Sequence, residues 1–329
     1  MSPGMSADGG PDGGGAGGAA PRFEGPVLPR GVVVTATGKP HYHALAARLA
    51  ASIKAHEPDL PVDILSDRPL DDPAFDRVHV DPNATRHTKV EALLRSRFER
   101  SLYLDSDTMA VAPFADVFDL LERFDVALAH DQFPANAYCA ITWRRDMPAA
   151  FPHFNGGVMA LRASPATHAF LRDWRAAIAA HGINRDQPSL RELIWLSDLR
   201  VATLPPEYNM MNFEILRAKS LDNCHMAPRI VHNPHFYQFH DQFRDSADPV
   251  ADALGPSLHA RMTALAAGDR TLRPGGGAVP RAGRVERGRR ALASLGRTAA
   301  AWPGYARFAW GYHGRRARGF LSRALGRGV

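Results

Sequence analysis

Short apolar runs alternate with amphipathic stretches through the middle of the chain. Residues 31–36 (GVVVTA) are a continuous apolar run, which predicts a strand buried on both faces. Residues 41–55 place Leu45, Leu49 and Ile53 at helical spacing and predict a helix. The same patterns predict strands at 61–65, 75–80, 102–104, 125–129, 157–161, 201–204 and 230–231, and helices at 90–98, 166–180 and 188–196. Strands that alternate with helices predict an α/β fold with a parallel or mixed sheet.

The two ends of the chain lack this pattern. Residues 1–28 are rich in Gly, Pro and Ala without periodicity, and we expect them to be disordered. The folded domain is predicted to span residues 29–245. Residues 246–280 begin with Asp, Ser and Pro and contain three consecutive glycines, and they are interpreted as a linker.

Positive charge is concentrated in residues 281–329, which hold 12 Arg and one Glu. The chain carries a net charge of +6, so residues 1–280 are mildly acidic at −5. Aromatic residues are interleaved with the arginines in this basic tail. Such a segment can lie on an anionic bilayer, which is the favoured interpretation. A disordered or locally folded tail is the second interpretation and nucleic-acid contact the third; no nucleic-acid partner is expected.

The remaining bulk features concern location. Cys139 and Cys224 offer neither a disulfide framework nor a CxxC metal motif, which is typical of a reducing compartment. No run reaches the roughly 18 apolar residues of a membrane span, and the N-terminus has no hydrophobic region of a secretory signal. We therefore expect a cytoplasmic protein, with peripheral attachment to the inner face of the membrane through residues 281–329.

The strongest chemical signal is the segment SLYLDSDTMAV, which begins at Ser101. A short apolar strand delivers Asp105 and Asp107, and residues i and i+2 of a strand point to the same side. Open α/β sheets bind their ligands at the carboxyl ends of the strands. Two carboxylates at that position suit Mg²⁺ or Mn²⁺. A solvated turn is the alternative interpretation of the same residues.

The order of motifs resembles the GT-A-fold glycosyltransferases, in particular glycosyltransferase family 8 and related nucleotide-diphospho-sugar transferases. The resemblance rests on six motifs between residues 31 and 236: Val34-Thr35-Ala36, Lys89, Leu102 to Asp107, Phe154 to Leu161 (FNGGVMAL), Asp186-Gln187 and Ile230-Val231-His232. It implies a mixed, mostly parallel sheet flanked by helices. The motif of the family continues after the histidine with Gly and Lys, whereas this chain has Asn233 and Pro234.

The resemblance also implies roles for individual residues. Asp105, Asp107 and His232 are expected to hold the metal, Mn²⁺ or Mg²⁺, with His235 and His240 as alternatives to His232. Asp186, Gln187 and Asn155 are the expected catalytic residues beside the transferred sugar. A helix N-cap is a second interpretation of Asp186. The expected contacts to the nucleotide and its diphosphate are Thr35, Ala36, Tyr42, Asp67, Lys89, Ser106, Gly156 and Gly157.

These assignments predict a metal-dependent, hexosyltransferase-like enzyme that moves a sugar from a nucleotide-diphosphate sugar, most simply a UDP-sugar, to an acceptor hydroxyl. Retention of configuration is expected from the resemblance. The acceptor is a glycan, a lipid-linked molecule or a protein. Two alternatives stay open: a degenerate transferase domain that serves as a peripheral membrane scaffold, and a nucleotidyltransferase on a similar sheet. A haloacid-dehalogenase-type phosphatase is disfavoured, because Met109 stands where that family has Thr or Val.

Overall fold

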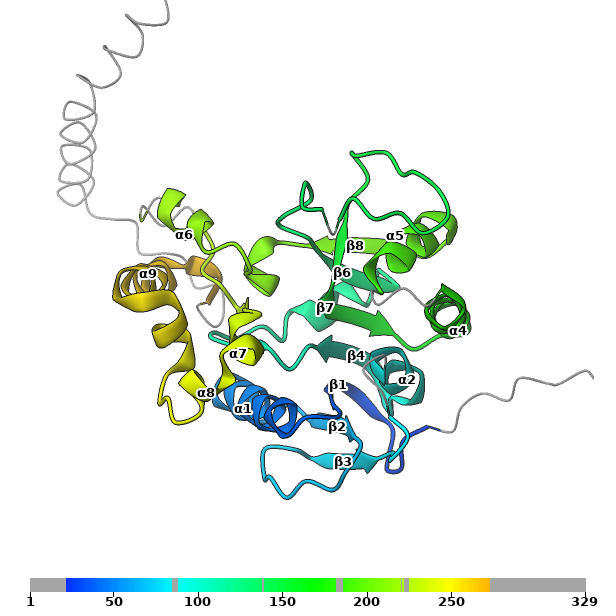
Figure 1. The fold of residues 1–329 in the computed structure, drawn as a ribbon, viewed down its shortest axis with the longest axis horizontal. Helices are drawn as coiled ribbons and strands as arrows, with labels where there is room; N and C mark the ends of the chain where they lie inside the picture. The colour runs from blue at the N-terminus through cyan, green and yellow to red at the C-terminus, as the bar shows by residue number, and fades with distance from the viewer. Residues whose placement is uncertain are drawn as a thin grey trace, which may run out of the picture. The chain divides into compact units, whose positions relative to one another are not determined.

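A seven-stranded sheet forms the centre of the protein in a computed structural model, which describes residues 22–84, 88–137, 139–181, 186–219, 221 and 225–272 (Figure 1). The strand order is β3-β2-β1-β4-β7-β6-β8. Strand β7 runs antiparallel to β4 and β6, and the other neighbours pair in parallel. The strands are β1 (Leu28–Ala36), β2 (Val62–Ser66), β3 (Arg77–Val80), β4 (Phe98–Leu104), β6 (Val126–His130), β7 (Phe154–Arg162) and β8 (Val201–Leu204). The predicted α/β fold with a mixed, mostly parallel sheet is confirmed.

Helices cover both faces of the sheet, because the strands are apolar on both sides. In β4, Leu102 and Leu104 belong to the core beneath α1 (Pro40–His56) and α3 (Val117–Leu120). Tyr103, between them in sequence, belongs to the opposite core. That core is covered by α2 (Thr88–Arg95), α4 (Pro165–His181) and α5 (Gln187–Leu196), which lie together on one side of the sheet in Figure 1. Alternate residues of a strand point to opposite faces, so one strand serves both cores.

The expected linker at residues 246–280 requires a correction, because α9 (Pro249–Gly268) lies within it. The helix begins with a cap in which Asp248 Oδ1 accepts a hydrogen bond from Ala251 N at 2.9 Å. Its apolar residues, among them Leu254 and Leu258, are buried in a third core against α6 (Glu214–Ala218), α7 (His235–Gln238) and α8 (His240–Phe243). Burial of each Leu side chain contributes about 1.5–3 kcal/mol, which explains why the segment is a helix of the domain.

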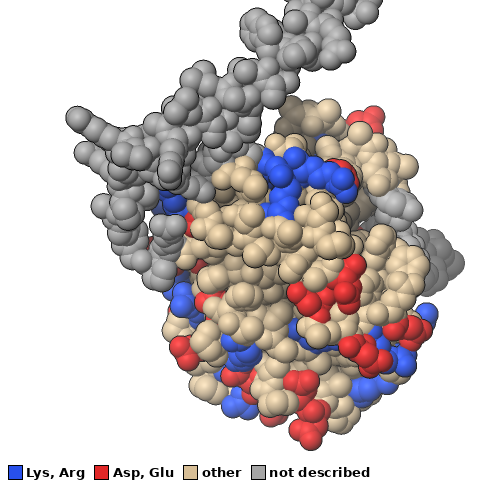
Figure 2. Space-filling view, turned by 90° about the vertical axis from the view of Figure 1, so that its left-hand side faces the viewer, with Lys and Arg blue, Asp and Glu red and all other residues tan. Residues whose placement is uncertain are grey.

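This third core also packs on a small antiparallel sheet of β5 (Thr108–Ala110) and β9 (Ile230–His232). Two 3₁₀ helices, η1 (Pro206–Asn209) and η2 (Arg270–Leu272), complete the secondary structure of the described residues. Figure 2 looks at the side of the domain that carries α8 and α9 in Figure 1, and basic and acidic side chains are interspersed on it. The expectations for residues 1–21 and for the basic tail, 281–329, lie outside the described residues.

Two boundaries near the start of the domain also differ from expectation. The predicted helix 90–98 ends at Arg95, and Phe98 opens β4 opposite Leu28. A Cβ atom on Gly31 would lie 2.3 Å from the Phe98 ring, so the glycine makes room for this aromatic residue. Phe23, within the segment expected to be disordered, is 4% exposed and stacks on His79 with ring centroids 3.8 Å apart. Long-range packing of aromatic rings therefore overrides the local composition.

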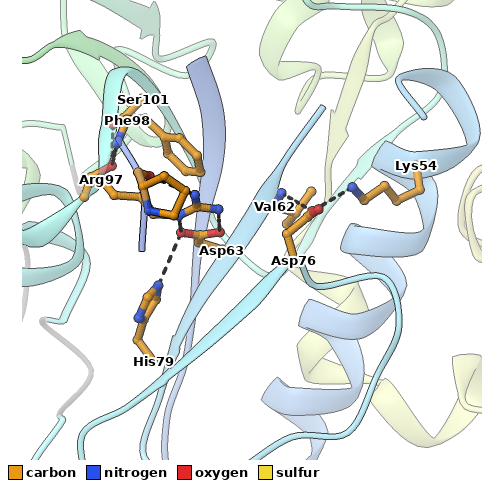
Figure 3. A network of polar contacts seen from close by, with 10 residues as sticks. Lys54, Val62, Asp63, Asp76, His79, Arg97, Phe98 and Ser101 are labelled. Atoms are coloured by element: carbon orange, nitrogen blue, oxygen red, sulfur yellow. Dashed lines mark hydrogen bonds and ion pairs between the residues drawn. The ribbon is translucent and has the colours of Figure 1, made fainter. Parts of the chain in front are cut away.

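A buried ion cluster ties β2, β3 and the start of β4 together (Figure 3). Asp63, fully buried in β2, accepts hydrogen bonds from Arg97 Nε at 2.7 Å and Nη2 at 2.9 Å. His79 Nε2 lies 3.2 Å from the same carboxylate. Burial raises the pKa of Asp63, but the His79 and Arg97 contacts outweigh it and the pKa is lowered overall. The carboxylate is therefore ionised and paired at neutral pH.

Candidate active site

The two predicted metal-binding aspartates lie in a tight turn that follows β4. Asp105 N donates to Gly157 O at 2.9 Å, which holds the start of the turn against β7. Asp105 O accepts from Thr108 N at 3.0 Å and from Thr108 Oγ1 at 2.7 Å, which returns the chain into β5. Asp105 and Asp107 therefore converge through this turn, and not through the alternation of a strand that the sequence suggested.

Pairing of β5 with β9 brings His232 to the aspartates. Thr108 is opposite His232 in this ladder, and Asn233 N donates to Asp107 O at 3.1 Å. His232 Nε2 lies 3.3 Å from Asp107 Oδ1. Asp105, Asp107 and His232 each offer one ligand atom, and these atoms lie within 4.8 Å of one another. A set of two carboxylates and one imidazole fits a divalent cation such as Mn²⁺.

Gly157 makes room for the His232 imidazole. A Cβ atom at this position would lie 2.4 Å from His232 Cε1 and 2.8 Å from Nδ1. On Gly156, a Cβ atom would lie 3.2 Å from Lys89 Nζ and 3.4 Å from Asp186 Oδ2. The close approach of these side chains is thus a second physical reason for glycine at both positions, beside the expected approach of a ligand. Gly157 in particular allows a side chain of the site to approach the backbone closely.

Lys89 supplies the positive charge at the centre of this cluster. Its Nζ lies 2.9 Å from Asp186 Oδ2 and 3.3 Å from Asp105 Oδ1, and it donates to Gly156 O at 3.0 Å. Burial lowers the pKa of Lys89, but the two carboxylates outweigh it and hold the pKa well above its usual value. Lys89 is therefore a cation, and it holds Asp186 in place. Asp186 makes no side-chain cap hydrogen bond to α5, so its contact with Lys89 replaces the capping role.

The three residues predicted to bind the metal do not share one direction of pKa shift. Burial raises the pKa of Asp105, and the neighbouring Asp107 adds to this effect against the opposing charge of Lys89. Burial also raises the pKa of Asp107, but His232 outweighs it, and the pKa of Asp107 is lowered. For His232, Asp107 outweighs the effect of burial and raises the pKa. Without a cation the imidazole and Asp107 therefore stabilise each other as an ion pair.

Tyr103 links the turn that carries Asp105 and Asp107 to β1. Its hydroxyl donates to Asp105 Oδ1 at 2.8 Å and lies 3.1 Å from Thr35 Oγ1. Because the single phenol hydrogen goes to the carboxylate, the Thr35 hydroxyl donates to Tyr103. Burial, followed by the Asp105 charge, raises the pKa of Tyr103 well above its usual value, so the phenol stays protonated. This hydrogen bond fixes one oxygen of Asp105.

A cavity of about 440 Å³ opens above these groups. Tyr42 of α1 and Tyr237 of α7 form part of its wall, with ring centroids 6.4 Å apart. Of the residues predicted to bind the nucleotide, this cavity is lined by Thr35, Ala36, Tyr42, Lys89 and Ser106, together with Asp105 and Asp107. The structure thus gathers residues that are spread over most of the domain sequence around one cavity.

Asn155 and Gln187 line a second cavity of about 520 Å³. Asn155 Oδ1 accepts a hydrogen bond from Gly157 N at 2.9 Å, which orients the amide at the start of β7. The residues that share this lining are carboxamides and apolar side chains for the most part, including Asn136, Asn233, Gln238, Phe133, Met211 and Phe213. Asp186, whose carboxylate contacts Lys89 of the first cavity, directly precedes Gln187 of the second cavity.

Three residues named from the sequence lie apart from this cluster. Asp67 accepts from Gly38 N at 2.8 Å and pairs with His43 and Arg68, and it does not line the 440 Å³ cavity. The hydrogen bond from Arg68 has the largest effect among its contacts, and together these contacts lower the pKa of Asp67 strongly, as expected for a structural ion pair. His235 lines the second cavity, and the His240 ring contacts His41. Neither histidine belongs to the metal-binding cluster found among the described residues.

Three residues that the sequence analysis did not identify are part of the site. Tyr103 could have been found, because it precedes Asp105 by two positions and strand alternation places both on one side. Tyr237 lines the first cavity from a short helix without a distinctive pattern. Asn209, at the end of η1, places its Oδ1 2.8 Å from His232 Nδ1. For Tyr237 and Asn209 the sequence carries no signal.

Fold and site together define an α/β domain with an acidic-histidine cluster at the carboxyl end of β4. Residues 85–242 match the family of nucleotide-diphospho-sugar transferases. The matched segment is just under half of the chain and agrees with the family that the motifs resemble, and the GT-A-like α/β fold is confirmed. No protein of curated function matches the sequence. The individual roles of the predicted site residues remain predictions.

A comparison with solved structures finds glycosyltransferases among the matches. GlyE of Streptococcus pneumoniae TIGR4 is 17% identical, with 62% of this chain and 54% of that chain covered and a TM-score of 0.45. The bifunctional WbbM is 15% identical, with 74% of this chain and 53% of the WbbM chain covered and a TM-score of 0.47. The galactosyltransferase LgtC, solved with donor and acceptor sugar analogues, is 16% identical, with 78% and 99% covered and a TM-score of 0.44. This chain spans about half the length of GlyE and WbbM.

Proposed function

We propose that this protein transfers a sugar from a UDP-sugar to an acceptor hydroxyl with the help of Mn²⁺ or Mg²⁺, and with retention of configuration. The observation that carries the proposal is the cluster of Asp105, Asp107 and His232, whose ligand atoms lie within 4.8 Å of one another. It borders the 440 Å³ cavity, which is of a size typical for a cofactor or small ligand. The nucleotide and diphosphate are assigned to this cavity.

Each side chain has a definite task in this proposal. The metal, when bound, supplies Lewis-acid stabilisation of the leaving nucleoside diphosphate. Tyr103 holds one oxygen of Asp105, and Lys89 holds Asp186 at 2.9 Å. A carboxylate that is paired with a cation is a poor nucleophile but still stabilises positive charge nearby. Asp186 is therefore assigned to stabilisation of the oxocarbenium-like sugar, and the Gln187 amide to its orientation.

The second cavity, of about 520 Å³, is assigned to the acceptor. Asn155 and Gln187 border it on the side of Asp186, where the acceptor hydroxyl has to meet the sugar. None of the described residues that line it is Lys or Arg, and carboxamides alternate with aromatic and apolar side chains. Carboxamides exchange hydrogen bonds with hydroxyl groups, and apolar faces of sugar rings pack on aromatic side chains. These features support an uncharged glycan end as the acceptor.

The donor and the metal are tested together by calorimetry on the full chain. UDP, GDP and CDP are titrated in the presence of Mn²⁺ or of EDTA, and product analysis with a UDP-sugar follows. We expect UDP to bind only with Mn²⁺, and we expect Asp107→Asn to abolish this binding while circular dichroism shows that the variant remains folded. A well-folded protein that binds none of the nucleotides would contradict the proposal and favour the degenerate scaffold. Binding of a nucleoside triphosphate in preference to UDP would favour the nucleotidyltransferase.

Peripheral membrane association through residues 281–329 is proposed on sequence grounds. None of the helices among the described residues is long and apolar enough to cross a bilayer. The face of the domain in Figure 2 mixes both signs of charge, whereas the tail carries 12 Arg and one Glu. We expect the full chain to sediment with vesicles that contain phosphatidylserine and to be released by salt. Equal sedimentation with neutral vesicles would contradict an electrostatic attachment.

A further inference from the structure

Asn209 is a completely buried residue whose side chain faces the predicted metal-binding histidine. Its Oδ1 lies 2.8 Å from His232 Nδ1, whereas His232 Nε2 points to Asp107 Oδ1 at 3.3 Å. An amide oxygen only accepts hydrogen bonds, so His232 Nδ1 carries a hydrogen in this contact. In the neutral imidazole that arrangement leaves the lone pair on Nε2, on the side of Asp105 and Asp107. Only a nitrogen with a lone pair can bind a cation.

The backbone around Asn209 is fixed from two sides. Met210 N donates to Ile230 O at 2.8 Å and His232 N donates to Met210 O at 3.0 Å, which joins the segment to β9. Gln132 Nε2 donates to Asn209 O. The amide and the imidazole are therefore held by the same small piece of sheet, and their relative position is set by the backbone.

The Asn209 amide is also costly to bury. Its Nδ2 makes no hydrogen bond to the residues that the structure describes. A buried amide that uses only half of its hydrogen-bonding capacity destabilises the fold, so such a group needs a reason to be present. Within the described part of the chain, the side-chain hydrogen bond that explains Asn209 is the one to His232 Nδ1.

We propose that Asn209 is a positioning residue that fixes the Nδ1–H tautomer of His232 and thereby directs Nε2 to the metal. The tautomer is inferred from geometry alone. The role of that tautomer in metal binding rests on the proposed metal-dependent function. If the Asn209 amide were turned around, its Nδ2 would donate to Nδ1 and the hydrogen would move to Nε2. His232 could then bond to Asp107 but could not bind a cation.

The tautomer is measured by long-range ¹H–¹⁵N NMR on the full chain labelled at histidine, with and without Mg²⁺ and UDP. The His232 signals are assigned by comparison with His232→Gln. We expect Nδ1 to be protonated in both states and Nε2 to lack a hydrogen when Mg²⁺ is bound. A neutral ring with a bare Nδ1 would overturn the inference. If the wild-type protein binds no metal at all, the proposed function fails, and spectra recorded at a pH where the His232 ring is neutral still decide the tautomer.

Metal affinity provides the second readout, through Mn²⁺ titrations followed by electron paramagnetic resonance. Asn209→Leu has a similar volume but no acceptor, and we expect Mn²⁺ affinity to fall about 10–100-fold, as for other outer-shell partners of metal-binding histidines. Asn209→Asp keeps the acceptor and should retain the affinity and the Nδ1–H signal. The matched control is Asn212→Leu, in the same segment, with unchanged affinity. Wild-type affinity and tautomer in Asn209→Leu would refute the positioning role.

Discussion

Gly157→Ala tests whether the close approach of His232 to β7 is required for the metal site. The added Cβ atom would lie 2.4 Å from His232 Cε1 and 2.8 Å from Nδ1. Carbon atoms in contact are about 3.5–4.0 Å apart, so the ring has to move back by about 1 Å. His232 is 5% exposed and is hydrogen-bonded to Asn209, so it has little room to move. Metal–ligand distances tolerate only about 0.2 Å.

The expected result is a loss of metal binding with a moderate loss of stability. Overpacking of a buried site costs about 1–3 kcal/mol in the free energy of unfolding. Mn²⁺ affinity, measured by electron paramagnetic resonance, should fall at least as far as on loss of an outer-shell partner, about 10–100-fold. The matched control is Gly156→Ala, whose Cβ would meet Lys89 Nζ at 3.2 Å. This approach is much less close than the 2.4 Å at Gly157, so we expect a much smaller effect.

A double mutant separates the clash from other effects of the substitution. In a His232→Ala background the ring is absent and only the Asn155 Oδ1 contact at 3.0 Å stays close, so Gly157→Ala should cost much less than in the wild-type background. Chemical denaturation measures both free energies. If Gly157→Ala costs the same in the presence and absence of the ring, or leaves Mn²⁺ affinity unchanged, the packing argument is refuted.

Two further predictions concern the buried ion cluster and the nucleotide cavity. Arg97→Met leaves Asp63 buried without its cation and should lower the free energy of unfolding by about 3–5 kcal/mol at pH 7 in urea denaturation. The double variant Asp63→Asn/Arg97→Met removes both charges, so its free energy of unfolding should fall by less. The pKa of Asp63 in the folded protein lies below the unfolded value of about 3.9. The contribution of Asp63 to the free energy of unfolding is therefore complete above that pH and is lost as the pH falls through the folded pKa. A wild-type stability that is flat below pH 4 would contradict this. Tyr237→Ala removes an aromatic wall of the cavity and should weaken UDP binding by about 1–3 kcal/mol in calorimetry. The control is Phe239→Ala, at an exposed residue, which should leave UDP binding unchanged. Equal effects of the two substitutions would argue against base stacking.

The sequence alone identified most of the sheet and much of the site. Runs such as residues 31–36 and 201–204 are apolar over the length of a strand, and this local pattern survives in the structure as β1 and β8. Asp105 and Asp107 were recognised because a short apolar strand precedes them. These features depend on neighbours in the chain, which is why they can be predicted from it.

Local pattern was insufficient where packing across the domain decides. Residues 249–268 have a helix-breaking Gly255-Pro256 pair and follow a polar stretch, so they resemble a linker. They nevertheless form α9, with a kink at the non-helical Gly255, because α6, α7 and β9 offer an apolar surface. Phe98 continues a helical pattern, but the space above Gly31 places it in β4. In each case the burial of apolar side chains by distant residues outweighs local preference.

The geometry of the site was likewise decided by tertiary structure. His232 lies 125 positions after Asp107, and only the pairing of β5 with β9 brings Nε2 to 3.3 Å from that carboxylate. Asn209 orients the imidazole from a 3₁₀ helix that has no sequence signature. The sequence by itself thus determined which chemical groups the site contains, because motifs are local. Their distances, partners and charges were decided by the fold, because hydrogen bonds and burial act between residues that are neighbours only in space.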